Sequence, residues 1–407
     1  MAKIRLLTIV LVFLTLVPPQ NQLTVMSTYC SVTGLSDTTV DYWPTTDWLE
    51  STPEEQGMNS TKLNQVIDYI NAQNFAIDSV VVVRHGYIVL EEYFNPSVSN
   101  QSSIHFVYSV TKSFSSALIG IAIQKGFIEN VDQKVVDFFS SRIIANLDSR
   151  KQNMTIEHLL TMSAGFEWDE QTYPYTDSRN DVRLMMNSSD SVQFVLDRPM
   201  VNDPGDEWVY NSGASHLLSA IIEQTTGYTT LDFANKFLFD PLGITDVDWW
   251  QDPQGLYYGG FGLYLRARDM AKFGYLYLNN GTWDSEQIVF TDWVAKSTET
   301  AFPRGWDRGY GYQWWTYPQS GVYYALGLYS QTIFVVPNYN MVVVFTANIT
   351  SGPNPEYNLL FDYIIPAVIN NTNATTTPFD ILLPTLLVAL MIPVIAAVVM
   401  LVRTRRR

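Results

Sequence analysis

The sequence YSVTKSFSSALIGIAIQKG, residues 108–126, sets a serine and a lysine at the start of an almost wholly apolar run. An apolar run of this length that ends at a glycine predicts a buried helix with its stop at Gly126. Ser109 and Lys112 are three residues apart, so on a helix they share one face about one turn apart. The lysine nitrogen could therefore reach the serine oxygen.

Such a pair suits nucleophilic catalysis. A serine hydroxyl needs a base to take its proton, and a lysine removed from water can have its pKa lowered enough to serve as a neutral acceptor. The start of the helix also supplies N–H groups and partial positive charge where an oxyanion would form. The alternative is a chance spacing in which Lys112 simply extends to solvent at a helix end.

A second stretch far along the chain favours the catalytic interpretation. The sequence PGDEWVYNSG, residues 204–213, contains a turn and Tyr210, and an apolar run at 214–226 follows it and stops at Gly227. The pattern predicts a turn and then a second buried helix, with Ser212 as its N-cap.

The two stretches together resemble the penicillin-recognising serine hydrolases, the superfamily of serine β-lactamases and penicillin-binding proteins, which pairs S-x-x-K with a Y-x-N-like element. Within it, the chain is most similar to the class C-like group of esterases and 6-aminohexanoate-dimer-hydrolase-like amidases. The similarity runs from Trp48 to Ile369 and includes VVVRHGYIVLEEY at 81–93, TIEHLLTMSAG at 155–165 and LRARDMAKFG at 265–274.

The fold expected is α+β. Residues 79–83 and 87–93 are β-branched and aromatic runs around His85-Gly86, and residues 332–336 and 341–345 flank a Pro-Asn-Tyr-Asn turn, so both pairs predict hairpins. The segments allow, and the resemblance implies, a β-lactamase/transpeptidase-like antiparallel sheet built from the N- and C-terminal parts. Helices would flank this sheet, a helical subdomain would carry Tyr210, and the site would lie at the seam.

The third element of the family departs from its pattern. The family has a Lys or His, a Thr or Ser and a Gly on the innermost strand, whereas YALGLYSQ at 324–331 places Ala325 and Leu326 before Gly327. An Ala-Leu pair cannot hold a substrate carboxylate, which argues against β-lactam hydrolysis and transpeptidation. The retained Gly327 still permits close approach of the strand, and the N–H of Leu328 is the candidate second oxyanion donor beside that of Ser109.

The resemblance also implies the remaining roles. Tyr210 would share a proton network with Lys112 and protonate the leaving group, although without its flanking turn and helix it would be taken as a core tyrosine. Ser212 stands where the family more often has asparagine, and Ser212, Gly327 and Gln331 are candidate substrate-binding residues. The expected reaction is two-step acyl transfer at an ester or amide carbonyl of a small molecule, without a metal or organic cofactor.

The two ends of the chain predict export and anchoring. Lys3 and Arg5 precede an apolar run, which predicts a signal peptide over 1–25 and a leader over 26–45. The hydrolase domain is expected at 46–369 and a polar linker at 370–380. Residues 381–402 carry no charge and would span about 33 Å as a helix, which fits a bilayer. The arginines at 403–407 would stay in the cytoplasm and leave the domain extracellular, with the chain as a single-pass protein of the cell membrane.

Composition agrees with this placement. The formal charge of -16 over 407 residues excludes nucleic acid as an expected partner, because phosphate binding needs a basic face. Cys30, the sole cysteine, lies outside the expected domain, so neither a disulfide nor a cysteine nucleophile is expected there. Sequons for N-glycosylation, which favour an extracellular surface, occur at Asn59, Asn100, Asn153, Asn187, Asn280, Asn348, Asn370 and Asn373.

Other chemistries have less support. The chain has no G-x-S-x-G element, which removes the main mark of an α/β-hydrolase, and its four histidines lack H-E-x-x-H spacing. His85 is expected in a turn and His216 in a structural role. The alternative from another functional class is a non-catalytic sensor or binding ectodomain that keeps the fold, which the altered third element leaves open. The oligomeric state does not follow from the sequence.

Overall fold

The computed structural model describes residues 42–96, 99–352 and 354–369. The predicted signal peptide, almost all of the leader, Cys30, the linker, the apolar run at 381–402 and the arginine tail lie outside the described residues, as do Asn370 and Asn373. Within the described ranges, no helix is both long enough and apolar enough to cross a bilayer.

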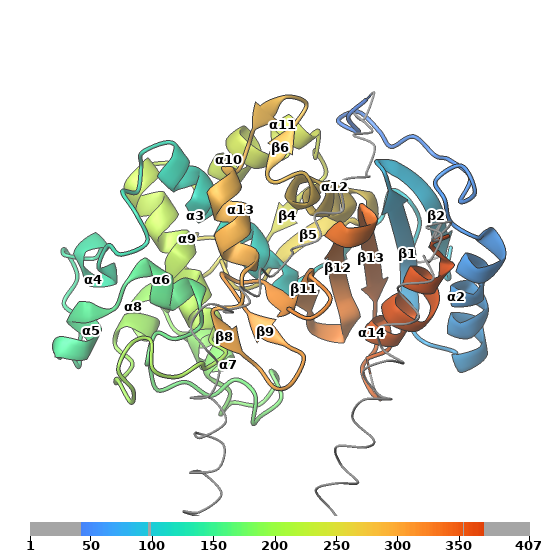
Figure 1. Ribbon diagram of the computed structural model, residues 1–407. Helices are drawn as coiled ribbons and strands as arrows, with labels where there is room; N and C mark the ends of the chain where they lie inside the picture. The colour runs from blue at the N-terminus through green and yellow to red at the C-terminus, as the bar shows by residue number, and fades with distance from the viewer. Residues whose placement is uncertain (1–41, 97–98, 353, 370–407) are drawn as a thin grey trace, which may run out of the picture. The chain divides into compact units, whose positions relative to one another are not determined.

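The described residues form one region built around a large sheet and another built mainly of helices (Figure 1). The α-helices are α2 (Ser60–Gln73), α3 (Thr111–Gln124), α4 (Val135–Phe138), α5 (Ser149–Asn153), α6 (Ile156–Leu160), α7 (Asp181–Asn187), α8 (Ser191–Leu196), α9 (Ser212–Thr226), α10 (Thr230–Ala234), α11 (Asp240–Leu242), α12 (Ala267–Leu278), α13 (Thr291–Thr298) and α14 (Glu356–Asn358). Short 3₁₀ or π segments are η1 (Tyr108–Val110), η2 (Asn235–Phe239), η3 (Leu328–Ser330), η4 (Pro337–Tyr339), η5 (Leu359–Ile364) and η6 (Ile365–Ala367).

The strands confirm the predicted sheet. They are β1 (Ile77–Arg84), β2 (Tyr87–Tyr93), β3 (Ile104–Phe106), β4 (Asp248–Trp249), β5 (Leu263–Arg266), β6 (Thr282–Trp283), β7 (Glu286–Gln287), β8 (Phe302–Pro303), β9 (Gly309–Tyr310), β10 (Trp315–Tyr317), β11 (Val322–Gly327), β12 (Gln331–Val336) and β13 (Met341–Ala347). Eight of them form one sheet in the order β2-β1-β13-β12-β11-β10-β9-β8, with every pairing antiparallel. The N-terminal strand β1 pairs directly with the C-terminal strand β13, so the two parts of the chain make one sheet.

Both predicted hairpins are present. His85 and Gly86 take φ of 49° and 87° between β1 and β2, and successive positive φ angles suit the right-handed twist of the flanking strands. Between β12 and β13, the turn η4 ends at Asn340, which has φ of 47°. Asparagine tolerates this left-handed conformation better than most residues do.

The sheet is covered on both faces because its side chains alternate in direction. In β1, Val81 and Val83 join the larger core with α3, α9 and α12, whereas Val80 and Val82 join a second core. The second core contains the buried face of α2 and the apolar side of η5, which contact each other (Figure 1). Helix α12 packs on β12 and β13, and α3 packs against α9 and β11. The predicted site would lie on this side of the sheet.

The two predicted buried helices are confirmed. All residues of α3 from Thr111 to Ala122 are buried, and the positive φ of Gly126 follows its end. Helix α9 contacts α3 and stops at Gly227, whose φ is 72°. One local expectation was wrong, because Asn211 and not Ser212 is the N-cap of α9: the Asn211 side chain accepts the N–H of Ala214 at 2.8 Å.

Candidate active site

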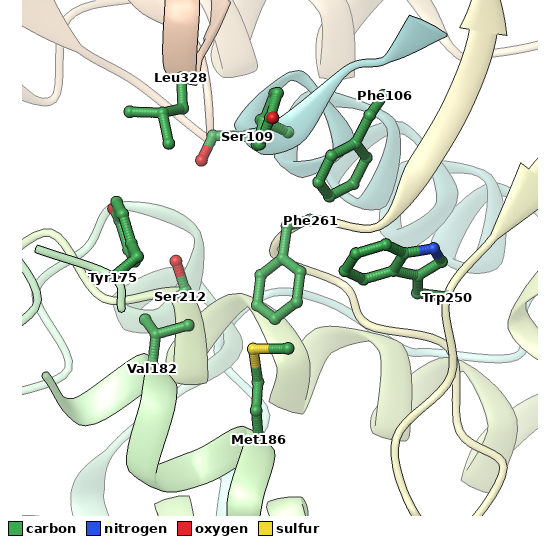
Figure 2. A pocket seen from close by; sticks show the side chains of 10 residues that line it. Phe106, Ser109, Tyr175, Val182, Met186, Ser212, Trp250, Phe261 and Leu328 are labelled. Carbon is green, nitrogen blue, oxygen red and sulfur yellow. The ribbon is translucent and has the colours of Figure 1, made fainter. Parts of the chain in front are cut away.

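Ser109 lies in the 3₁₀ turn η1, immediately before α3. The preceding residue, Tyr108, has φ of 48°, a left-handed conformation that is costly for a bulky side chain. The Thr111 hydroxyl holds this turn by donating to the Tyr108 carbonyl at 2.6 Å. Strained backbone of this kind is found mostly where a side chain must be held in one direction. Figure 2 shows the Ser109 hydroxyl on the side of the turn that faces Leu328, Tyr175 and Ser212, which line a pocket with it.

Lys112 lies in the first turn of α3, with its ammonium group directed toward Ser109. The residue is only 2% exposed. Its nitrogen donates to Ser109 Oγ at 3.0 Å, to Ser212 Oγ at 2.9 Å and to the Gly260 carbonyl at 2.7 Å. Three acceptors match the three protons of an ammonium group. Burial lowers the pKa of Lys112 to about 8, against an opposing effect of the Glu170 charge. A neutral fraction that grows as the pH rises toward 8 is thus available to take the serine proton.

The ring of Tyr210 covers the lysine, with Nζ 4.7 Å from the ring centroid. Trp208 and Trp315 pack against this ring and keep it from solvent. Burial and the Glu170 charge raise the pKa of Tyr210, while a hydrogen bond with Ser109 opposes the rise. The phenol therefore keeps its proton, which makes it a suitable acid for a departing group.

Glu170 is a site residue that the sequence analysis missed. It is 2% exposed, and each of its oxygens accepts two hydrogen bonds. Oε1 accepts from Ser212 Oγ at 2.8 Å and from the Tyr175 hydroxyl at 3.1 Å. Oε2 accepts from the Ser212 N–H at 2.6 Å and from Trp168 Nε1 at 2.7 Å. A single glutamate in an acidic stretch belongs to no motif, so only the three-dimensional contacts reveal it.

Ser212 connects this carboxylate to the lysine. Because Asn211 caps α9, the Ser212 hydroxyl is free to accept from Lys112 and to donate to Glu170. A chain of hydrogen bonds therefore runs from Ser109 through Lys112 and Ser212 to Glu170. The carboxylate is the charge that partly offsets the desolvation of the buried ammonium.

Gly260 is another site residue that the sequence analysis missed. Its carbonyl accepts from Lys112, and a Cβ at this position would lie 2.8 Å from the Ser212 carbonyl oxygen. Within the run Gly259-Gly260-Phe261-Gly262, the first two glycines therefore approach α9 more closely than other residues would permit. This glycine-rich run was the available sequence signal.

The innermost strand β11 supplies the opposite wall. A Cβ on Gly327 would lie 2.3 Å from the Val107 carbonyl oxygen, so only glycine allows this approach to the nucleophile turn. Leu328 follows the strand beside Ser109, and Leu326 lies on the same wall. The predicted oxyanion donors, the N–H groups of Ser109 and Leu328, thus belong to segments that meet here.

Gln331 does not share this wall, and its predicted role in substrate binding was wrong. Its side chain is 2% exposed and lines neither of the two cavities beside Ser109. The amide instead donates to the Ala347 carbonyl and accepts from the Ala347 N–H at 3.4 Å. Gln331 therefore completes the backbone pairing between β12 and β13.

Two cavities meet at Ser109 and Leu328. The first has a volume of about 130 Å³ and is lined by Phe106, Tyr108, Ser109, Tyr175, Val182, Met186, Ser212, Trp250, Phe261 and Leu328 (Figure 2). The second has a volume of about 350 Å³ and is lined by Ser109, Gln171, Tyr175, Tyr210, Trp315, Leu326, Gly327, Leu328, Tyr329, Ile349, Thr350, Ser351, Gly352 and Asn354. We call them the apolar pocket and the polar cleft.

Three tryptophans and two histidines are placed as follows. Trp250 lines the apolar pocket and Trp315 the polar cleft, while Trp168 binds Glu170. His216 is fully buried with its Nε2 3.2 Å from Asp252, away from both cavities. His85 lies in the β1–β2 turn.

Comparisons with known proteins show similarity over most of the chain. The family model described as "Beta-lactamase" matches residues 63–364. A 6-aminohexanoate-dimer hydrolase of Paenarthrobacter ureafaciens is 24% identical over 306 residues, which cover 69% of this chain and 74% of that protein. An uncharacterised protein of Alkalihalophilus pseudofirmus is 24% identical over 348 residues, which cover 75% and 91%.

Among solved structures, EstCE1, a hydrolase with promiscuous acyltransferase activity, has a TM-score of 0.64 and 16% identity over 76% of this chain and 98% of its own. This likeness shows that the β-lactamase-like α+β fold is shared.

The lysine geometry predicts a pH dependence that Glu170 controls. Because the base must be neutral, kcat/KM for an ester should rise with pH through about 8 and fall below it. Removing the charge in Glu170→Gln should lower the pKa of Lys112, since Glu170 raises it, and should move the rising limb to lower pH. Measuring kcat/KM from pH 5 to 10 tests this.

The matched control is Glu167→Gln, which neutralises an exposed carboxylate three residues away. Its rising limb should coincide with that of the wild type. A Glu170→Gln profile that falls in height without moving along the pH axis would mean that Glu170 acts only as a structural support.

Proposed function

Because this chain belongs to the beta-lactamase family, as a serine hydrolase of the esterase and amidohydrolase type, we propose that it cleaves ester or amide bonds through an acyl-enzyme on Ser109. The observation that carries the assignment of roles is the desolvated Lys112 ammonium 3.0 Å from Ser109 Oγ. Burial of a cation is costly. The buried Lys151 ammonium donates to three backbone carbonyls, whereas two of the three acceptors of Lys112 are serine hydroxyls, one of them the nucleophile.

The contacts support the following first half-reaction. Ser109 Oγ attacks the substrate carbonyl carbon and its proton passes to neutral Lys112 Nζ. The carbonyl oxygen gains the electron pair and is held by the N–H groups of Ser109 and Leu328. When the carbon–leaving group bond breaks, Tyr210 gives its proton to the departing oxygen or nitrogen, and Lys112 returns a proton to the phenolate.

The second half-reaction reverses the order of events with water. Water attacks the acyl-enzyme carbonyl, its proton passes through Tyr210 and Lys112 to Ser109 Oγ, and the acid leaves. Positioning of these groups before reaction supplies the catalysis.

The composition of the polar cleft supports esters and ordinary amides over β-lactams. Leu326 lines it where a relative with the usual third element has a hydroxyl residue, and the lining contains no Lys or Arg. A carboxylate on the substrate would enter this cleft without a cationic partner, which costs binding energy. The non-catalytic alternative is disfavoured because a binding protein needs no desolvated base on a serine.

Covalent labelling tests the reaction. Incubation of the purified domain with a fluorophosphonate should add one phosphonyl group, detected by intact mass, and the adduct should be absent from Ser109→Ala. A penicillin should give no lasting adduct and no turnover. Folded wild-type protein that reacts with neither reagent would contradict the hydrolase assignment.

We further propose that the enzyme is anchored in the cell membrane by residues 381–402, with its active site outside the cell. The uncharged run, the arginines after it and the apolar N-terminal run support this placement. Of the sequon asparagines in the described residues, Asn100, Asn153, Asn187, Asn280 and Asn348 are exposed. Their exposure is compatible with N-glycans on the folded domain.

Expression of the full chain in a eukaryotic cell line tests the anchor. The wild type should stay in the membrane after carbonate extraction, shift in mass with a glycosidase and be cleaved by protease added outside the cell. Leu387→Arg with Leu390→Arg should release the protein, whereas Leu387→Ile with Leu390→Ile should not. Carbonate-soluble, unglycosylated wild-type protein would contradict the proposal.

A further inference from the structure

We propose that the preferred substrates are esters or amides of short, neutral, apolar carboxylic acids of about four to six carbons, with a larger and polar alcohol or amine part. This inference rests on the proposed reaction at Ser109 and specifies its substrate class. It assigns the acyl chain to the apolar pocket and the leaving group to the polar cleft.

The position of Tyr210 fixes this orientation. Tyr210 lines the polar cleft but not the apolar pocket, whereas Ser109 and Leu328 line both. The acid that protonates the leaving group must lie within hydrogen-bond reach of it. The leaving group therefore occupies the polar cleft, and the carbonyl sits between Ser109 and Leu328. The acyl chain is left with the apolar pocket on the other side.

The lining of the apolar pocket selects for a neutral chain. None of its lining residues is charged, and most of the lining consists of aromatic and aliphatic side chains from several segments. Phe106 stacks on Trp250 with ring centroids 4.7 Å apart, and Val182 and Met186 of α7 form the floor in Figure 2. A terminal ammonium or carboxylate on the acyl chain would lose its hydration here without gaining a partner.

The nearest carboxylate does not change this conclusion. Glu170 lies behind Ser212 and Tyr175, and all four of its hydrogen bonds are to protein donors. The Ser212 and Tyr175 side chains, rather than the Glu170 oxygens, face the pocket. An ammonium group would have to break these bonds to reach it.

The volume limits the chain length. An apolar protein cavity of about 150 Å³ holds one benzene molecule, which has six carbons. The apolar pocket, at about 130 Å³, should therefore take an acyl chain of similar or slightly smaller size. The polar cleft is larger, at about 350 Å³, and Gln171, Thr350, Ser351 and Asn354 offer it hydrogen-bonding groups. It can hold a bulkier, hydrophilic leaving group.

A series of p-nitrophenyl esters tests the assignment, with the Ser109→Ala rate subtracted at each length. Each buried methylene should raise kcat/KM about threefold or more, giving about tenfold from acetyl to butanoyl. The value should peak between butanoyl and hexanoyl and fall at decanoyl. The ester of 6-aminohexanoic acid, which adds an ammonium to the same chain, should react at least tenfold more slowly than the hexanoyl ester.

Two variants locate the effect. Met186→Trp should fill the pocket floor and reduce kcat/KM for hexanoyl far more than for acetyl, while Met186→Ala should move the peak to longer chains. The control Ser351→Leu alters the polar cleft and should leave the order of chain lengths unchanged.

The outcomes separate this inference from the proposed reaction. Fluorophosphonate labelling of Ser109 with a flat chain-length profile, or equal rates for hexanoyl and 6-aminohexanoyl esters, would overturn the acyl-pocket assignment and leave the reaction standing. A chain-length order that Met186→Trp does not alter, in a variant that labels normally, would also overturn it. Absence of labelling in folded protein would overturn both.

Discussion

The buried ammonium of Lys112 is the constraint on which the site depends. Removing a lysine from water is costly. Three hydrogen-bond acceptors offset that cost, together with the Glu170 carboxylate, which reaches the lysine through Ser212. Each acceptor comes from a different part of the chain: the nucleophile turn, the start of α9 and the glycine-rich segment before β5. The packing of α3 against α9, and of Gly260 against Ser212, is therefore also the assembly of the catalytic base.

The same burial separates the tasks of the titrating groups. Desolvation lowers the pKa of Lys112 and raises that of Tyr210, so the lysine becomes a base near neutral pH while the tyrosine remains an acid. The Glu170 charge, held by four donors, opposes the lowering of the Lys112 pKa and reinforces the raising of the Tyr210 pKa. The end of β11 contributes Gly327 and Leu328, which place backbone groups rather than charged side chains beside the reacting carbonyl. A substrate is consequently recognised by shape and apolar contact on one side of Ser109 and by neutral polar groups on the other.

Much of the fold could be predicted from local sequence patterns. The two hairpins, the buried helices ending at Gly126 and Gly227, and the S-x-x-K spacing could all be predicted, because each depends on residues close in sequence. Glu170 could not, since its role exists only through contacts across the fold with residues such as Ser212. The glycine-rich run indicates a close backbone approach at Gly260, but not that its carbonyl accepts from Lys112. Gln331 was misassigned for the same reason: its proximity to Leu328 in sequence does not reveal that its amide pairs with Ala347. Ser212 was misread as a cap because Asn211, beside it, is an equally good capping residue.

Direct titration of the Lys112 side chain tests the central claim. With ¹³C-labelled lysine, the Cε resonance absent from Lys112→Arg would be followed by NMR from pH 6 to 11. A midpoint near 8 would show that burial makes Lys112 a base at physiological pH. A midpoint close to the ordinary lysine value of about 10.4 would contradict it, because Lys112 would then remain charged and could not take the Ser109 proton.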